Sequence, residues 1–305
     1  MKLKVTYFPH KLKSAEVEKV IGFSIATKEC VWGGRKSKEY LDVFSRNGGF
    51  TIRLNFDFQS SNCIKYSHFV LLPRHCYKEP DKVYLKNLDY SENLPIHHET
   101  NFGKFKVRDV VYTGEIKSAN DRILSMETCE SYLIRKELIN DMSKEYDGVF
   151  PIPVVNYKTG EEVEEWASFK SDSWLKEVNE DETSIIKVDS GSGYKYIERL
   201  GLLSADHEYL NDMPDIFKLP QADSRGDSHY VVSQRLFLYW MGKGIKSFWI
   251  VPFLDTSSKE YENYLTLWHE VNRVYLPRHS KRLQCSQRRK YERHEIHRRI
   301  QNCSH

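Results

Sequence analysis

A few short clusters of charged side chains contain the residue types that enzymes use. Asp109, Glu115 and Lys117 combine two carboxylates with a lysine, as in metal-dependent nucleases that hold Mg²⁺ beside an attacking water. Those nucleases place the carboxylates on adjacent strands. Here the spacing is short, and Gly114 predicts a turn between the two acids. We therefore favour a hairpin with surface charges over a nuclease site.

Three other clusters show part of a ligand-binding or catalytic pattern. His294 and His297 have the spacing of metal ligands on a helix, but the surrounding arginines would repel a divalent cation. The segment 189–194 has the glycines of a phosphate-binding loop without its GxxxxGK[ST] pattern, which favours a flexible loop. His75 precedes Cys76, but a catalytic dyad needs partners that meet in space. The sequence thus predicts no catalytic residue, no metal site and no cofactor.

The bulk composition is that of a protein with a substantial core. The chain has 305 residues, of which 13% are aromatic, and this excludes global disorder. The first residues lack the apolar run of a signal peptide, and no apolar stretch is long enough to span a bilayer. Six cysteines at wide, irregular spacings, none of them as CxxC, favour free thiols. We expect a cytoplasmic, non-enzymatic protein that does not bind membranes.

Charge divides the chain into an acidic middle and a basic end. The segment 161–189 has ten acidic residues and three lysines. Acids around exposed aromatic rings suit a protein interface, in which the rings anchor and the charges steer a basic partner. The alternative is a solvated loop whose aromatic residues lie in the core. The candidate partner-binding residues are Glu161, Glu162, Glu164, Glu165, Trp166 and Trp174.

The basic end supports a second hypothesis for the function. Residues 277–305 contain nine Lys or Arg and two Glu, and each cation could neutralise a phosphate. Tyr291 is the only aromatic residue among them, so base stacking has little support. Nucleic-acid binding through this tail is therefore the alternative function. The other explanation is a solvated tail, or one that docks on the acidic middle.

The first hundred residues predict mixed structure with β content. Alternation of apolar and polar residues predicts strands at 2–7 and 51–58, and the mostly apolar run 68–72, stopped by Pro73, predicts another. Apolar spacing predicts a helix over 14–25. Residues 87–102 are polar and rich in turn formers, which predicts a connection.

One pattern occurs twice: apolar strand, serine, helix, glycine, apolar strand, proline. The first copy begins at Ile123 with Ser125 as the predicted helix N-cap, and it closes with Gly148 and the strand that follows. The second copy begins at Val231 with Ser233 as the N-cap, and Gly242 or Gly244 would end its helix. A further helix is predicted to start at the capping box 257–260.

The second copy resembles a sequence pattern found in bacterial immunity proteins that are encoded beside polymorphic or type VI secreted toxins. Residues 214–217, Pro-Asp-Ile-Phe, and the segment 231–253 are similar to the immunity protein eleven family. Relatives of that family carry a doubled CxxCG motif, which this chain lacks. The resemblance implies a cytoplasmic, non-enzymatic protein that neutralises one cognate toxin by stoichiometric binding.

These observations together predict an α+β protein with two lobes and a tail. The expected divisions are an N-terminal lobe at 1–100, a C-terminal lobe at 104–276 and a basic tail at 277–305. The C-terminal lobe would contain the two related strand–helix–strand units. The expected partner is a toxin protein, and a basic toxin would complement the acidic middle.

Overall fold

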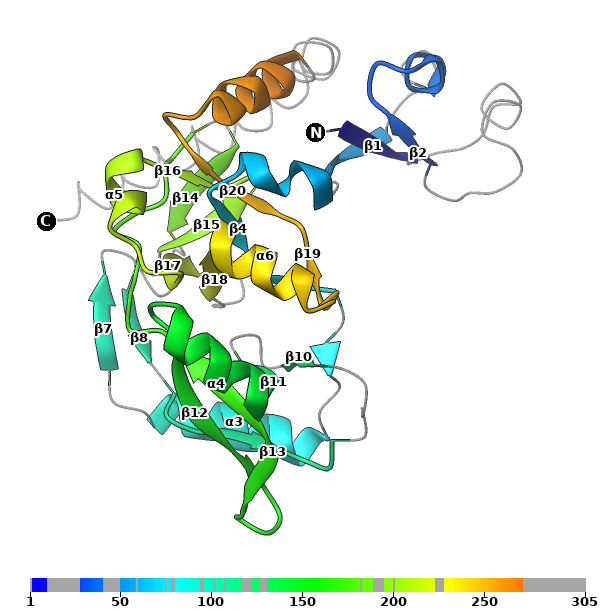
Figure 1. Ribbon diagram of the computed structural model, residues 1–305. Coiled ribbons are helices and arrows are strands. Elements are labelled where there is room, and N and C mark those ends of the chain that lie inside the picture. The colour runs from blue at the N-terminus through cyan, green and yellow to red at the C-terminus, as the bar shows by residue number, and fades with distance from the viewer. Residues whose placement is uncertain are drawn as a thin grey trace, which may run out of the picture. The chain divides into compact units, whose positions relative to one another are not determined.

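The chain is α+β, with strands that form curled sheets and helices that pack on them (Figure 1). In this computed structural model the described residues are 2–9, 28–40, 50–58, 60–74, 76–77, 80–93, 96–100, 103–106, 108–116, 122–126, 131–181, 183–188, 195–199, 201–222 and 228–270. They belong to two compact units, Phe58–Tyr261 and Lys2–Asp57 with Glu262–His305. The lobes expected at 1–100 and 104–276 stay a prediction. The tail 277–305 lies outside the described residues.

The unit formed by residues 2–57 and 262–305 contains a three-stranded antiparallel sheet in the order β2-β1-β3. Its strands are β1 (Lys2–Pro9), β2 (Lys28–Val31) and β3 (Phe50–Asp57). The strands expected at 2–7 and 51–58 coincide with β1 and β3, whereas the helix expected at 14–25 lies outside the described residues. Residues 35–40 are helical.

The unit Phe58–Tyr261 contains a six-stranded sheet, a seven-stranded sheet and two short ribbons. The six-stranded sheet, in the order β6-β10-β11-β13-β12-β9, consists of β6 (Cys76–Tyr77), β9 (Val111–Thr113), β10 (Ile123–Met126), β11 (Tyr132–Arg135), β12 (Phe150–Asn156) and β13 (Glu162–Lys170). The seven-stranded sheet, in the order β14-β15-β17-β18-β4-β20-β16, consists of β4 (His68–Val70), β14 (Ser184–Val188), β15 (Lys195–Arg199), β16 (Ser204–Ala205), β17 (Ile216–Ala222), β18 (Ser228–Ser233) and β20 (Pro252–Asp255). The ribbons pair β5 (Leu72–Pro73) with β19 (Phe248–Trp249) and β7 (Ile96–Thr100) with β8 (Gly103–Lys106).

The helices of this unit connect and cover the strands. They are η1 (Ser60–Lys65), α3 (Asp81–Asn93), α4 (Lys136–Glu145), α5 (His207–Asn211) and α6 (Gln234–Gly242). A last helix runs from 259 to 270, so its residues from Glu262 onward belong to the other unit; its N-cap is Ser258, whose Oγ accepts the Tyr261 N–H at 3.1 Å. This start was predicted to within one residue.

The connection expected at 87–102 is wrong, because α3 and β7 occupy most of it. Asn87 explains why polar residues form a helix here. It is buried, its amide donates to the Tyr112 carbonyl at 2.9 Å, and its Oδ1 accepts the Tyr112 N–H at 2.9 Å. The asparagine thus satisfies the backbone of β9 and holds α3 against that strand, a contact that turn propensity does not reveal.

The twin pattern corresponds to two modules with the same sheet topology. The first module has the strand order β10-β11-β13-β12-β9, and the second has β17-β18-β4-β20-β16. In both, the first three pairings are antiparallel and the last is parallel. Helix α4 connects β11 to β12, and α6 connects β18 to β20 by way of the short β19, in each case across one intervening strand. The two strand–helix–strand units are therefore related in three dimensions as well as in sequence.

Strand registers make the two modules equivalent residue by residue. Ala167 pairs with Ile134 and Pro153, just as Phe69 pairs with Val232 and Pro252. Hydrogen bonds at two further places repeat as well. Arg135 N donates to Arg122 O in the first module, as Ser233 N donates to Asp215 O in the second. Lys158 N likewise donates to Asn156 Oδ1 in the first module, as Ser257 N donates to Asp255 Oδ1 in the second.

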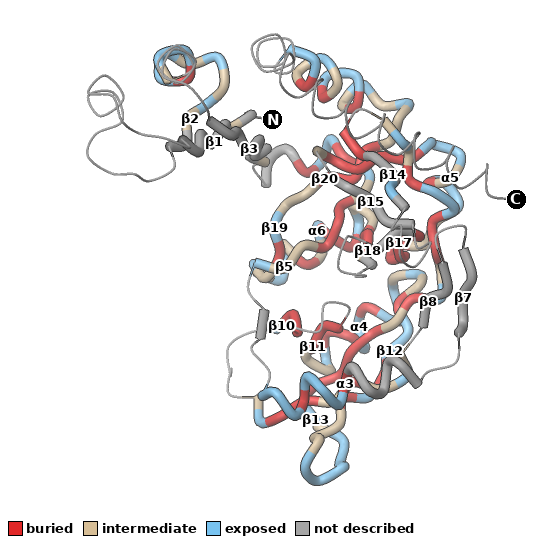
Figure 2. Tube along the Cα trace, turned by 180° about the vertical axis from the view of Figure 1, so that it is seen from behind, coloured by how far each residue is buried: buried red, intermediate tan, exposed pale blue. Residues whose placement is uncertain are grey.

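Equivalent residues of the two modules also touch each other. The rings of Tyr132 and Tyr230 lie 6.1 Å apart, and Trp240 Nε1 lies 3.3 Å from Met142 Sδ. Equivalent residues meet only beside a two-fold axis, so the modules form a local pseudo-symmetric pair. Figure 2 marks buried residues along the central strands of both sheets, where each module has its own apolar cluster.

The first copy of the pattern begins later than the sequence suggested. Ser125 is not a helix N-cap, because it lies in β10, is 3% exposed and pairs with Tyr132. The helix starts at Lys136, after the strand-forming run Tyr-Leu-Ile of β11. The second copy is confirmed, since Ser233 Oγ accepts the Leu236 N–H at 3.2 Å and Gly244 follows α6 with φ +75°.

Candidate functional site

The acidic residues predicted to bind a partner lie on the exposed hairpin of β12 and β13. Glu161, Glu162, Glu164 and Glu165 are all exposed. Lys136 binds Glu162 at 2.7 Å and Arg135 binds Glu165, so these two carboxylates are fixed to the start of α4. Among the described residues, Glu161 and Glu164 have no ion pair. The hairpin therefore presents two compensated and two uncompensated negative charges.

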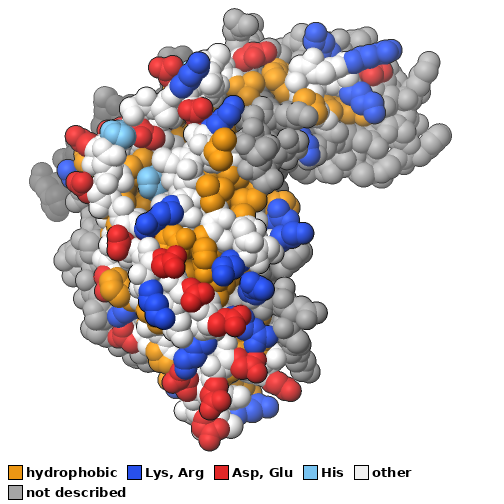
Figure 3. All heavy atoms as spheres, viewed as in Figure 1, with side chains coloured by type: hydrophobic (Ala, Val, Ile, Leu, Met, Phe, Trp, Pro, Cys, Tyr) orange, Lys and Arg blue, Asp and Glu red, His pale blue; other side chains and the backbone are white. Residues whose placement is uncertain are grey.

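Helix α4 extends this negative surface. Glu137, Asp141 and Glu145 recur every four residues, and all three are exposed, so they form one stripe along the helix. Because α4 packs on β11, β12 and β13, the stripe belongs to the same module as the hairpin. We call the stripe and the four hairpin glutamates the acidic face. Figure 3 shows red side chains over α4 and at the end of the hairpin. Sequence reasoning missed the stripe, although its spacing of four was visible.

The two tryptophans predicted beside these acids are core residues. Trp166 is 3% exposed and belongs to the apolar cluster of the first module, and Trp174 is 8% exposed. The guanidinium carbon of Arg135 lies 4.3 Å from the centre of the Trp166 ring, so the indole supports the cation that holds Glu165. Neither tryptophan is an exposed anchor. A partner-binding role for this segment depends on its acids alone.

The motif that carries the family resemblance forms a buried junction between the modules. Asp215 is 8% exposed and its carboxylate accepts hydrogen bonds from Ser233 Oγ, from the Arg235 guanidinium and, at 3.0 Å, from the Asp147 N–H. Burial alone would raise the pKa of Asp215, but the bonds from Arg235, Ser233 and Asp147 outweigh it and lower the pKa. We call these four residues the Asp215 junction.

Gly148 completes this junction from the first module. It has φ +81°, and a Cβ at this position would lie 2.5 Å from the Ile216 carbonyl oxygen. Glycine is therefore required both by the backbone conformation and by the close approach of β17. Three segments meet at this place: the Pro-Asp-Ile-Phe segment 214–217, the Ser233–Arg235 segment and the Asp-Gly turn. Their role here is structural.

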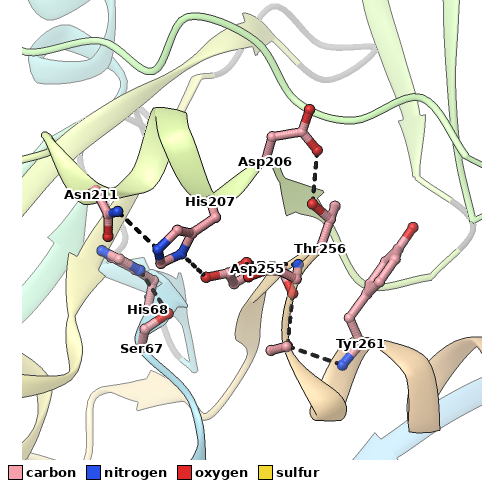
Figure 4. Close-up of polar contacts among 10 residues, drawn as sticks. Ser67, His68, Asp206, His207, Asn211, Asp255, Thr256 and Tyr261 are labelled. Carbon is pink, nitrogen blue, oxygen red and sulfur yellow. Dashed lines mark hydrogen bonds and ion pairs between the residues drawn. The ribbon is translucent and has the colours of Figure 1, made fainter.

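A second polar cluster lies at one edge of the seven-stranded sheet (Figure 4). Because β16 and β20 are parallel, their carboxyl ends meet, and β4 begins at the same edge. His207 Nδ1 lies 2.6 Å from Asp255 Oδ2, and Asn211 Nδ2 lies 2.8 Å from His207 Nε2. The two contacts fit the tautomer in which Asn211 donates to Nε2 and the Nδ1–H donates to Asp255.

The remaining contacts of this cluster fix the carboxylates in place. Ser257 donates its N–H at 2.8 Å and its hydroxyl at 2.7 Å to Asp255, and Thr256 donates to Asp206 at 2.7 Å. Burial alone would raise the pKa of Asp255, but the bonds from Ser257 and His207 outweigh it and lower the pKa. Burial lowers the pKa of the neighbouring His68 to about 4. Both His207 nitrogens have partners, so among the described residues the ring does not activate a nucleophile.

The other sequence candidates are not brought together as a site. Lys170 binds Asp109 at 2.6 Å at one end of β9, whereas Glu115 follows the other end, and Lys117 lies outside the described residues. Among the described residues β9 pairs in parallel with β12, and 114–116 are not in a strand; the rest of the hairpin expected across Gly114 lies outside the described residues. The segment 189–194, His75 and the pair His294 and His297 also lie outside the described residues.

The described part of the chain contains neither a candidate metal site nor a candidate membrane span. There, no group of three or more His, Cys, Asp or Glu is placed to hold a metal ion. No described helix has the length and apolarity to cross a bilayer. No protein-family model and no curated protein matches this chain.

Proposed function

We propose that this chain is an immunity protein that neutralises a cognate toxin by stoichiometric binding through its acidic face. The observation that carries the proposal is the placement of seven exposed carboxylates on one rigid module, three on α4 and four on the β12–β13 hairpin. The stretch 135–170, which contains all seven, has eight acidic and five basic residues, so eight minus five leaves a net charge of −3. A surface of this sign suits a basic partner.

The carboxylates would contribute to binding in two ways. Glu161 and Glu164 would steer a basic partner and speed its association, because exposed charges act over roughly 8–10 Å at physiological ionic strength. Glu162 and Glu165 already bind cations, so a partner must displace or share Lys136 and Arg135. The uncompensated pair should therefore dominate the electrostatic contribution.

Rigidity of the module supports binding without a large entropic cost. The β12–β13 ladder, the buried Trp166 and the Asp215 junction fix the hairpin and the adjoining turn before any partner arrives. Preorganised surfaces lose less conformational entropy on association. The resemblance of residues 214–217 and 231–253 to immunity proteins adds support. Those residues belong to the second module, which Asp215 joins at Asp147 to the module that carries the acidic face.

The test pairs the full chain with the protein encoded by the adjacent gene. The two should co-purify at equal stoichiometry, and co-expression should rescue growth from the toxicity of that protein. Replacing both Glu161 and Glu164 with lysine should slow association at least about tenfold at low salt and flatten its salt dependence. The matched control replaces two exposed acids elsewhere in the unit, Glu177→Lys with Glu180→Lys.

Two results would count against the proposal. One is failure of the purified wild-type proteins to form a complex. The other is a complex whose association rate falls equally in both double variants, because net charge alone would then explain the effect. Deletion of residues 278–305 separates the alternative function, since a nucleic-acid-binding tail predicts loss of DNA or RNA binding in the deleted chain.

A further inference from the structure

Trp249 is an exposed tryptophan held in a fixed position. It is 54% exposed, whereas its neighbour in β19, Phe248, is 6% exposed and stacks on Trp240 with 5.3 Å between ring centres. Successive side chains of a strand point to opposite sides, so burial of Phe248 directs Trp249 outward. Pairing of β19 with β5 fixes the backbone.

Arg74 covers the Trp249 ring and is itself oriented. Its Nε donates to the Phe248 carbonyl at 2.9 Å, and its guanidinium carbon lies 4.9 Å from the centre of the indole. Arg74 has no ion pair among the described residues, so its terminal nitrogens keep their capacity to donate. A planar guanidinium held in this way matches the two oxygens of a carboxylate.

The chain segment that carries Trp249 is basic and apolar. Between 228 and 254 the sequence has no Asp or Glu, and Lys243 and Lys246 on this segment are exposed. Figure 3 shows hydrophobic side chains over α6 and β19 with Lys and Arg side chains beside them. The acidic face and this surface belong to the same unit but carry opposite charge.

We propose that Trp249 and Arg74 form an anchor site for an acidic, partly apolar segment of the bound protein. This inference rests on the proposed function for the identity of that protein. The indole takes an apolar side chain against its exposed surface, while Arg74 binds the carboxylates together with Lys243 and Lys246, which precede Trp249 by a few residues. Tryptophan and arginine are the residues most enriched among binding hot spots, and a preoriented pair loses little entropy on binding.

A protein segment fits this surface better than a nucleic acid does. Single-stranded nucleic acids bind to series of aromatic rings on which successive bases stack. Trp249 is the one exposed aromatic ring of the segment 228–254, and Arg74 already covers one face of it. The available donors suit a few carboxylates beside an apolar contact.

The first test uses short fluorescein-labelled probes and the full chain, with binding followed by anisotropy. The probes are a peptide of alternating glutamate and phenylalanine, the same peptide with lysine in place of glutamate, and a homothymidine oligonucleotide. The acidic peptide should bind best, and Trp249→Ala or Arg74→Gln should each raise its Kd at least about tenfold, equivalent to about 1.4 kcal/mol. Leu85→Ala and Lys176→Gln are the controls, because Leu85 is 60% exposed and Lys176 lies 4.8 Å from the centre of the Tyr209 ring.

Each contrary outcome overturns the inference. No binding of the acidic peptide, binding that both variants leave unchanged, or tighter Arg74-dependent binding of the oligonucleotide would all do so. Lys246→Glu provides a second variant that leaves the Trp249–Arg74 pair intact and should also weaken the acidic peptide.

The second test measures the complex with the adjacent-gene protein. If no complex forms, the proposed function is wrong, and the peptide result still decides whether the anchor exists. If the complex forms with equal affinity for wild type and Trp249→Ala, this inference is wrong and the proposed function stands.

Discussion

Replacing Asp215 with alanine should destabilise the unit Phe58–Tyr261 while leaving its surface unchanged. The substitution removes the acceptor for three donors: Ser233 Oγ, the Asp147 N–H and the Arg235 guanidinium. A buried donor left without a partner costs about 1–3 kcal/mol. Ser233 can still cap α6 by accepting the Leu236 N–H, so the helix start is retained.

The expected magnitude follows from how far each hydrogen bond is buried. The Asp147 N–H and the Ser233 hydroxyl should each cost about 1.5 kcal/mol, because the carboxylate they bond is only 9% exposed. Arg235 is 61% exposed, so water replaces much of its ion pair and the loss there is at most about 1 kcal/mol. The sum is about 3–4 kcal/mol. For a unit of roughly 200 residues this lowers the Tm by about 6–16 °C.

Thermal unfolding followed by circular dichroism measures the effect. Asp212→Ala, an exposed position on the turn before the junction, should shift the Tm by less than about 2 °C. Arg235→Ala should cost at most about 1 kcal/mol, which separates the buried bonds from the ion pair. A stability of Asp215→Ala within about 1 kcal/mol of wild type would refute the assignment of Asp215 as the link between the modules.

Three further outcomes are expected. Gly148→Ala should lower the free energy of unfolding in urea by at least about 2 kcal/mol more than Gly160→Ala does. Both residues have positive φ, but only at Gly148 would a Cβ meet the backbone, 2.5 Å from the Ile216 carbonyl oxygen. Equal costs would show that β17 can move away. His68 has a pKa of about 4 in the folded chain, below the unfolded value near 6.5, so the unfolded state binds a proton first as the pH falls. Stability should therefore be fully present above pH 6.5 and decline between about pH 6.5 and 4, by on the order of 3 kcal/mol, and His68→Gln should flatten that part of the profile; an unchanged profile would contradict the assignment. Asp255 and Asp215 have lowered pKa values, so their contributions to the stability of the fold are present above their unfolded pKa values near 3.8 and are lost as the pH falls through their folded pKa values. Asp255→Asn should therefore remove part of the remaining acid sensitivity, measured as Tm against pH. A variant as acid-sensitive as wild type would argue against the Asp255 contacts.

Local signals in the sequence were sufficient for the second module and insufficient for the first. Ser233, the apolar residues Leu236 and Trp240 and the stop at Gly244 all act within α6, so their spacing predicts the helix and both of its ends. In the first module Ser125 has the same residue type but lies in a strand, because its neighbours pair with β11. Arg135, which no capping rule would select, precedes α4 without a side-chain cap.

The candidate sites were predictable only where they are local. The hairpin glutamates are contiguous in sequence, and their exposure follows from their charge. The burial of Trp166 and Trp174 depends on packing of the sheet, and the cluster of His207 with Asp255 depends on a parallel pairing of β16 with β20. In the sequence, Asp215 is one residue of the segment 214–217 that resembles immunity proteins. Only its three hydrogen-bond donors show that it links the two modules.

The position of each module's central strand in the sequence affects when that module can fold during synthesis. In the first module that strand, β13, follows β12 directly, so the module can close as soon as residue 170 has been synthesised. In the second module it is β4, at residues 68–70, whose partners β18 and β20 come more than 150 residues later. At about 5–20 residues per second, β4 waits on the order of ten seconds or more on the ribosome with both edges unsatisfied. A translating chain therefore exposes Phe69 and Val70 to chaperones or to other nascent chains, and pauses between codons 170 and 230 should increase misfolding of the second module selectively.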